Sequence, residues 1–161
     1  GGSLGAKNIN EAISKKWEKI VNDKDIRLFW ATGKDNFEQA TYRMRNFGSA
    51  VVKPYFDNAA DLMAAVDLVI CRAGASTISE LIELEKPAIL IPYDFVGQKE
   101  NADVLEYADA AKIFSNEEVD KALEEALELV KQDSILDFMS SNAKTLKKGN
   151  AANIILKEME I

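Results

Sequence analysis

Small polar residues and one carboxylate follow a buried apolar run in the segment 67–80, in an order that suits phosphate binding. Residues 68–71 (Leu-Val-Ile-Cys) are typical of a buried strand, and the chain then turns into a helix whose first turn carries Ser76 and Thr77. Backbone N–H groups and the positive end of that helix dipole would meet a phosphate at the carboxyl end of the strand. Glu80 follows Ser76 by four residues, so a ribose diol beside the phosphate lies within its reach.

The same spacing also fits an ordinary strand–turn–helix junction of an α/β protein. In that interpretation Arg72 is a surface residue and Glu80 is a solvated helix position. The spacing alone therefore leaves nucleotide binding and a purely structural junction both open.

Four motifs together resemble the MurG family, the peptidoglycan N-acetylglucosaminyltransferases that convert lipid I to lipid II. Residues 71–80 match the family's donor-site pattern Cys-Arg-x-Gly-Ala-x-Thr-x-x-Glu. Three further matches lie in the family's order: Gly-Gly-Ser-Leu-Gly-Ala (1–6), Pro-Ala-Ile-Leu-Ile-Pro (87–92) and Gln-Lys-Glu-Asn-Ala (98–102). The resemblance covers almost the whole chain, and four spaced matches are more specific than any single one.

The resemblance implies an α/β fold with a doubly wound, Rossmann-like parallel sheet. This would be the carboxyl-terminal half of an inverting glycosyltransferase of the two-Rossmann-domain (GT-B) kind. We therefore expect residues 1–161 to form a UDP-sugar donor-binding domain, with the amino-terminal acceptor domain absent. The family takes UDP-N-acetylglucosamine as donor and lipid I as acceptor, needs no cofactor or divalent ion for donor binding, and lies peripherally on the cytoplasmic side of the cell membrane. We expect the chain alone to be inactive, because catalysis requires both substrates held in register.

The resemblance also implies substrate-binding residues, and no catalytic residue in this chain. Ser3 and the small residues that begin the signature helix would contact the diphosphate. The backbone of Phe56 would contact uracil, and Gln98 would contact the N-acetylglucosamine, while Arg72 would stabilise the departing UDP. The full set is Ser3, Phe56, Arg72, Gly74, Ala75, Ser76, Thr77, Ile78, Ser79, Glu80, Gln98 and Asn101.

The chain departs from the family pattern just before this sugar-binding segment. Gly97 stands where the family often has Gln or His, and the loop before it is shortened. The side-chain amides of Gln98 and Asn101 can donate and accept hydrogen bonds together, which suits sugar hydroxyls. Sugar recognition is therefore the part of the resemblance that the departure affects.

Composition excludes several classes of function. The chain has a net charge of −7 and no histidine. The negative charge, without a basic stripe, argues against nucleic-acid binding, and the lack of histidine excludes a Ser-His-Asp triad and histidine-ligated zinc. The single cysteine, Cys71, is expected to be a buried thiol, which fits a reducing cytoplasm. No apolar run is long enough to span a membrane, and the start at Gly1 indicates a fragment or a processed chain.

Helices and strands alternate along the chain. We expect strands at 26–31, 50–52, 68–71, 88–91 and 111–114, and helices near 9–21, 36–47, 58–66, 98–107, 119–130, 134–147 and 150–158, besides the signature helix. This order predicts a parallel sheet covered on both faces, with the ligand at the carboxyl ends of the strands. In the MurG family a further strand precedes the glycine-rich turn, and its central place here is either a gap or is filled by another segment.

Other functions stay open from the sequence. They are a related UDP-sugar-dependent glycolipid glycosyltransferase, a sugar-nucleotide epimerase of similar fold, and a non-catalytic sugar-nucleotide-binding partner subunit. An epimerase would call for different acid–base groups. A native gene of roughly 350 residues would favour the transferase, because that length accommodates two domains.

Overall fold

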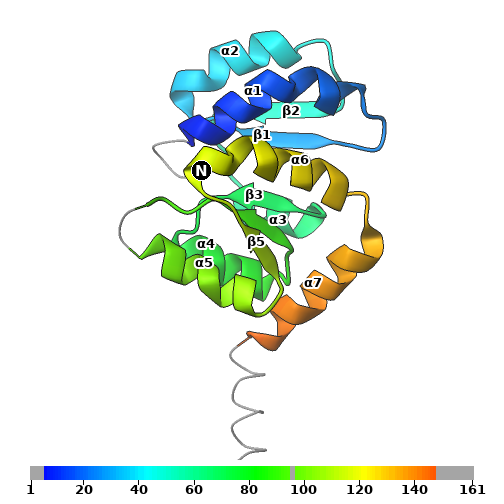
Figure 1. The fold of residues 1–161 in the computed structure, drawn as a ribbon. Helices are drawn as coiled ribbons and strands as arrows, with labels where there is room; N and C mark the ends of the chain where they lie inside the picture. The colour runs from blue at the N-terminus through cyan, green and yellow to red at the C-terminus, as the bar shows by residue number, and fades with distance from the viewer. Residues whose placement is uncertain (1–5, 95–96, 148–161) are drawn as a thin grey trace, which may run out of the picture.

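The computed structural model describes residues 6–94 and 97–147 of the chain, and helices and strands alternate there as predicted (Figure 1). The helices are α1 (Lys7–Asn22), α2 (Lys34–Met44), α3 (Ala59–Ala65), α4 (Ala75–Glu83), α5 (Gln98–Tyr107), the 3-10 turn η1 (Asn116–Glu118), α6 (Val119–Leu129) and α7 (Asp133–Thr145). The strands are β1 (Leu28–Ala31), β2 (Ala50–Lys53), β3 (Val69–Cys71), β4 (Ala88–Leu90) and β5 (Ala111–Ile113). The helix predicted at 150–158 lies outside the described residues.

The strands are parallel, as predicted, but within the described residues they form two sheets instead of one. β1 pairs with β2, and β3, β4 and β5 pair in that order. β1 and β3 are not hydrogen-bonded to each other, and among the described residues β1 pairs with β2 alone and β3 with β4 alone. The division falls at the central place where the MurG family has a further strand. Within the described residues this place is a gap and is not filled by another segment.

Both faces of the three-stranded sheet are covered by helices. Along β4, Ile89 and the following Ile91 belong to the core that contains α1 and α6, while Ala88 and Leu90 belong to the core that contains α4 and α5. All four side chains are fully buried. This alternation is what a central parallel strand requires, because successive side chains point to opposite faces.

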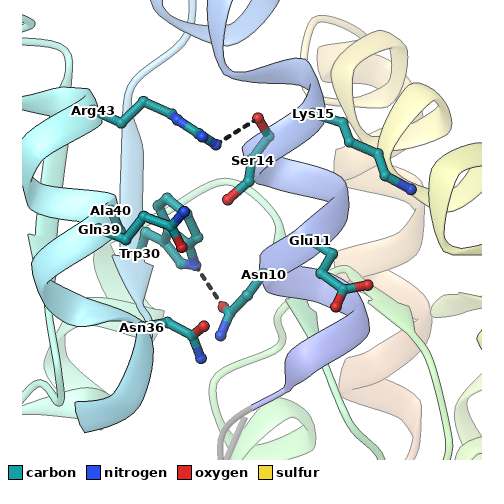
Figure 2. Close-up of a pocket in the computed structure, with 9 residues that line it drawn as sticks. All are labelled: Asn10, Glu11, Ser14, Lys15, Trp30, Asn36, Gln39, Ala40 and Arg43. Atoms are coloured by element: carbon teal, nitrogen blue, oxygen red, sulfur yellow. Dashed lines mark hydrogen bonds between the residues drawn. The ribbon is translucent and has the colours of Figure 1, made fainter.

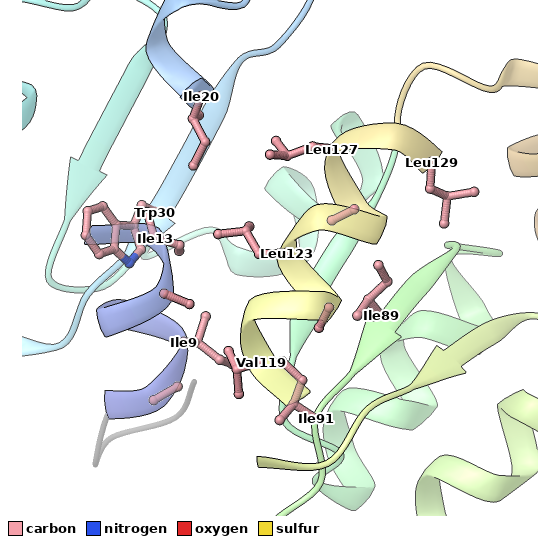
Figure 3. Packing of buried hydrophobic residues seen from close by; sticks show 14 of the residues in the cluster. Ile9, Ile13, Ile20, Trp30, Ile89, Ile91, Val119, Leu123, Leu127 and Leu129 are labelled. Carbon is pink, nitrogen blue, oxygen red and sulfur yellow. The ribbon is translucent and has the colours of Figure 1, made fainter. Parts of the chain in front are cut away.

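Helices α1 and α6 close the space between the two sheets (Figure 3). Ile9 and Ile13 of α1 and Leu123 of α6 lie in one apolar cluster with Trp30 of β1 and Ile89 of β4. The cluster therefore joins elements of both sheets into a single core, and the two sheets are held together by packing and not by a shared strand ladder.

The helix after β2 is apolar in sequence but is not buried. The segment 58–66 reads as an apolar helix, yet none of the side chains of α3 is buried. Its apolar content is mostly alanine, which costs little to expose because a methyl group presents a small apolar area.

An ion-pair cluster fastens α1 to α6 at the surface. Glu124 of α6 accepts hydrogen bonds from Lys16 and from Lys19 Nζ (2.7 Å), both on α1. The hydrogen bonds from Lys16 and Lys19 lower the pKa of Glu124 from 4.5 to about 2. A lowered pKa stabilises the fold above pH 4.5, and this contribution disappears as the pH falls from there towards 2.

Glu124→Gln is therefore expected to destabilise the chain at neutral pH and to have little effect near pH 2. The expectation is checked by measuring the urea midpoints of the wild type and the variant at several pH values between neutral pH and pH 2. Glu128→Gln on the same helix is the matched control, because Glu128 makes no ion pair among the described residues. If the difference in urea midpoint between the wild type and Glu124→Gln stays constant with pH, the role of the carboxylate is refuted.

Candidate functional site

The first turn of α1 joins the carboxyl edges of the two sheets. Asn10 Nδ2 donates to Thr32 O (2.9 Å), directly after β1, and Asn10 Oδ1 accepts from Trp30 Nε1 (2.9 Å). Asn8 Nδ2 donates to Asn116 Oδ1 (3.4 Å), in the turn that follows β5. The carboxyl ends of both sheets therefore lie on one side of the molecule, which is where parallel α/β sheets bind ligands.

Three backbone N–H groups at the start of α4 have no hydrogen-bond partner among the residues that the structure describes. The first N–H that bonds back into the helix is that of Ile78, which donates to Gly74 O (3.0 Å). The N–H groups of Ala75, Ser76 and Thr77 thus have no acceptor among the described residues. They lie at the positive end of the helix dipole, an arrangement that binds phosphate groups.

Gly74, which precedes α4, leaves open space beside this helix end. Its backbone is at φ −64° and ψ 147°, a conformation that any residue adopts. A Cβ placed on Gly74 would meet no atom within 4 Å. Neither backbone strain nor packing in the described fold requires a glycine here, so the open space is itself a feature of the site.

The exposed face of α4 carries polar side chains at the predicted spacing. Ser76 and Glu80 are both exposed and are one helical turn apart. Ser79 Oγ donates to Ala75 O (3.1 Å), so this hydroxyl bonds back to its own helix. Ile78 is only 6 % exposed and belongs to the core, so its side chain does not line the surface on which Glu80 lies.

Arg72 is buried beneath the turn that leads into α4. It is 7 % exposed, and its guanidinium carbon lies 4.1 Å from the centroid of the Tyr93 ring. Its Nη1 donates to Ile91 O (2.9 Å) and to Asn116 Oδ1. Its Nε is buried and has no partner among the described residues. The structure thus gives Arg72 an inward position between the ends of β3 and β4, and the expectation that Arg72 stabilises the departing UDP stays a prediction.

The two candidate amides at the start of α5 both hold the turn before α4. Gln98 Oε1 accepts from the backbone N–H of Ala73 (3.3 Å) and of Tyr93 (3.0 Å). Asn101 Nδ2 donates to Ala73 O (3.1 Å). Both lone pairs of Gln98 Oε1 are used by these two backbone N–H groups, so the side chain can meet a ligand only as a donor, through its Nε2. Gly97, where the chain departs from the family, adopts the left-handed conformation at φ 70° and begins this helix.

Phe56 lies in the loop after β2, at the same edge. Gly33 N, after β1, donates to Pro54 O (3.0 Å), after β2, so the loops that follow these two strands run side by side. Phe56 is half-buried, and Lys53 Nζ lies 5.7 Å from its ring centroid. Ser3 and most of the glycine-rich turn lie outside the described residues.

Asn116 is a residue of this edge that the sequence analysis missed. Besides the bonds to its oxygen, its Nδ2 donates to Pro92 O (3.3 Å) and to Asp94 Oδ2 (3.3 Å). The available signal was the Ser-Asn-Glu-Glu run at 115–118, which has capping-box spacing and forms that box around η1. A polar residue in a cap that closely follows a parallel strand is placed at the ligand edge of the sheet.

Other chemistry is limited in the described part of the chain. Burial raises the pKa of the Cys71 thiol to about 12, so it stays protonated at neutral pH, and the predicted buried thiol is confirmed. Residues 6–94 and 97–147 contain no group of three His, Cys, Asp or Glu side chains placed to hold a metal ion. None of the helices in these two ranges is long and apolar enough to cross a membrane.

A cleft lies between α1 and α2, apart from the start of α4. This cleft of about 350 Å³ has Asn10 and Trp30 at its base, and Asn36, Gln39 and Arg43 of α2 along one side (Figure 2). Arg43 Nη1 donates across it to Ser14 O (2.9 Å). The cleft holds none of the residues that the sequence analysis assigned to substrate.

Comparison with known proteins identifies relatives over nearly the whole chain. The family model described as the glycosyltransferase family 28 C-terminal domain matches residues 1–157. The UDP-N-acetylglucosamine–N-acetylmuramyl-(pentapeptide) pyrophosphoryl-undecaprenol N-acetylglucosamine transferase of Fusobacterium nucleatum is 49% identical over 164 residues, which is 100% of this chain and 46% of that protein. The transferase of the same name from Acetivibrio thermocellus is 36% identical over 96% of this chain and 44% of its own length.

Among solved structures, the crystal structure of Acinetobacter baumannii MurG matches with a TM-score of 0.78 and 24% identity. The match covers 99% of this chain and 50% of that one. The likeness confirms the predicted α/β fold with parallel strands, and the family model identifies it as a carboxyl-terminal domain of family 28 glycosyltransferases. This chain thus spans about half the length of the curated relatives it matches.

Proposed function

Because the chain belongs to the glycosyltransferase family 28 C-terminal domain family, we propose that it binds the donor of an inverting N-acetylglucosaminyltransferase. In this proposal the whole protein transfers N-acetylglucosamine from UDP-N-acetylglucosamine to lipid I and so produces lipid II. The observation that carries it is the start of α4, where three N–H groups without a partner in residues 6–94 and 97–147 lie one turn from an exposed carboxylate. The Fusobacterium nucleatum relative, named for this transfer, supports the choice of donor and acceptor.

Each part of the donor is assigned to a segment of the carboxyl edge. The diphosphate takes the N–H groups that begin α4, together with Ser3, and the ribose hydroxyls donate to Glu80. The uracil edge is read by the backbone at Phe56, and the sugar hydroxyls are bound by Gln98 and Asn101. Backbone recognition of the base tolerates changes of the Phe56 side chain, because the groups that read uracil are common to all residues.

The chemical contribution of this half is to stabilise the leaving group. When an acceptor hydroxyl attacks the anomeric carbon from the opposite face, the bond to the diphosphate breaks and negative charge grows on UDP. Fixed N–H groups at the end of α4 meet that charge without having to reorganise. The acceptor that carries the attacking hydroxyl is bound by another part of the protein, which also supplies the base and makes the peripheral contact with the cytoplasmic side of the membrane.

The whole chain, 1–161, is proposed to be one donor-binding domain that takes its central strand from a preceding segment of a longer protein. The unpaired edges of β1 and β3 and the coverage of less than half of the relatives support this. A polypeptide extended to include the preceding strand is expected to unfold at a higher temperature than the chain alone. Equal melting temperatures would contradict the assignment.

Calorimetry with UDP-N-acetylglucosamine, UDP-glucose and UDP-galactose tests the proposed function. Preferred binding of UDP-N-acetylglucosamine is expected. Preferred binding of another UDP-sugar would favour the related glycolipid transferase, and absence of binding would contradict the proposal. A complete protein that binds the donor without transferring it would indicate the non-catalytic partner subunit.

Gly74→Ala is expected to weaken donor binding several-fold while the fold is kept. The added methyl group occupies space that the fold leaves empty but that the diphosphate would use. The loss of a glycine before the helix costs at most about 1 kcal/mol of stability. Gly48→Ala is the matched control, because a Cβ there also meets nothing within 4 Å. Unchanged affinity in Gly74→Ala would place the ligand elsewhere.

A further inference from the structure

Asn116 connects four segments of the carboxyl edge through one side-chain amide. Its oxygen accepts from Arg72 Nη1 at the end of β3 and from Asn8 Nδ2 at the start of α1. Its Nδ2 donates to Pro92 O and to Asp94 Oδ2 in the loop after β4, each at 3.3 Å. Asn116 itself begins η1, directly after β5. A single residue therefore ties together the ends of all three strands of the larger sheet and the helix that follows the glycine-rich turn.

Arg72 extends this connection to the turn before α4. Its guanidinium is held by the oxygens of Ile91 and Asn116 and lies against the Tyr93 ring. The next residue, Ala73, is completely buried, and its N–H and C=O are bound by Gln98 and Asn101 of α5. The turn is thus fixed from β4 and η1 on one side and from α5 on the other.

We infer that Asn116 and Arg72 are positioning residues, which hold the start of α4 and residues 92–94 after β4 in the geometry that binds the donor. Neither residue needs to contact the donor for this role. The buried guanidinium and its inward hydrogen bonds support a role through Asn116, because a group with 7 % exposure has little surface to offer a ligand. The inference rests on the proposed function for the identity of the ligand.

A double-mutant cycle tests the inference. UDP and UMP affinities are measured by calorimetry for the wild type, Arg72→Lys, Asn116→Ala and the double variant. If the two residues act as one unit, each single variant lowers the affinity for UDP and for UMP by a similar factor, about fivefold or more. The double variant then binds each nucleotide as tightly as the single variant with the lower affinity. If Arg72 instead contacts the diphosphate, its variant weakens UDP far more than UMP and adds to Asn116→Ala, which would overturn the inference.

Asn142→Ala is the matched control for this cycle. Asn142 Nδ2 donates to Asp109 O (3.2 Å) on an exposed part of α7, so the same kind of hydrogen bond is lost away from the edge. Nucleotide affinity in Asn142→Ala is expected to equal that of the wild type. If Asn116→Ala fails to fold, Asn8→Ala replaces it at a half-buried helix position, and it is expected to weaken both nucleotides about twofold. Unchanged affinities in that variant would then overturn the inference.

Amide hydrogen exchange separates failure of this inference from failure of the proposed function. Absence of UDP-N-acetylglucosamine binding by the wild type contradicts the proposed function alone. The Ala73 and Tyr93 amides, which donate to Gln98, report the geometry of the turn without any ligand. Faster exchange of these two amides in Asn116→Ala, with the amides of α6 unchanged, supports the positioning role, and equal exchange contradicts it.

Discussion

The 161-residue chain alone is expected to form no lipid II when supplied with UDP-N-acetylglucosamine and lipid I. It spans 46% of the Fusobacterium nucleatum relative. Glycosyl transfer requires the acceptor hydroxyl to be held against the anomeric carbon, and correct positioning of two reactants supplies about 7–11 kcal/mol of the barrier. Loss of that contribution lowers the rate by more than five orders of magnitude, which is below detection in a transfer assay.

The measurement is a transfer assay with labelled donor on the chain and on the complete gene product that contains it. Calorimetry on the same samples serves as the control, because the chain is expected to bind the donor even though it does not transfer it. If the chain alone formed product at a rate comparable with that of the complete protein, this would contradict the proposal that the acceptor is bound by another part of the protein.

Glu80→Gln is expected to weaken UDP binding tenfold or more with little change in stability. If the carboxylate accepts both ribose hydroxyls, a neutral amide loses charge-assisted hydrogen bonds of roughly 1.5–3 kcal/mol. An exposed glutamate of a helix contributes only about 0.3–1 kcal/mol to folding through the dipole. Because dUDP lacks one of the two hydroxyls, the wild type should prefer UDP to dUDP, and the variant should discriminate less between them.

Titration of both proteins with both nucleotides measures this effect. Glu83→Gln is the matched control, since Glu83 is exposed on the same helix at the end away from the proposed phosphate position. A change in stability without a change in affinity would indicate that Glu80 is an ordinary helix residue. Equal affinities in all four titrations would refute the ribose assignment.

The helices and strands were predictable because local sequence determines them. The apolar run before the signature helix and the apolar β4 segment between two prolines have few alternative structures. The sequence could not decide whether the place between β1 and β3 is a gap or is filled. The pairing of two strands far apart in the sequence depends on the three-dimensional packing of α1 and α6, and hydrophobic periodicity does not encode it. The predicted strand limits were also one or two residues too long at several ends, where the ladder stops before the apolar run does.

The candidate site was predictable as a location more than as a set of contacts. The strand–turn–helix order placed residues 74–80 at the sheet edge, because the carboxyl ends of parallel strands meet there. The burial of Arg72 was not apparent, since an arginine after a strand is equally compatible with solvent. The bonds of Gln98 and Asn101 to Ala73 join residues 25 and 28 positions apart, and no local pattern encodes them.

The most direct test of the account is to follow backbone amide chemical shifts of the chain during titration with UDP-N-acetylglucosamine. We expect the largest changes at the start of α4, at Ala75 to Thr77, and at the start of α5, with smaller changes in the loop of Phe56. We expect no comparable change at Asn36 and Gln39 in the α1–α2 cleft. Shifts concentrated in that cleft, with the start of α4 unaffected, would contradict the central claim that the donor binds at the carboxyl edge of the sheet.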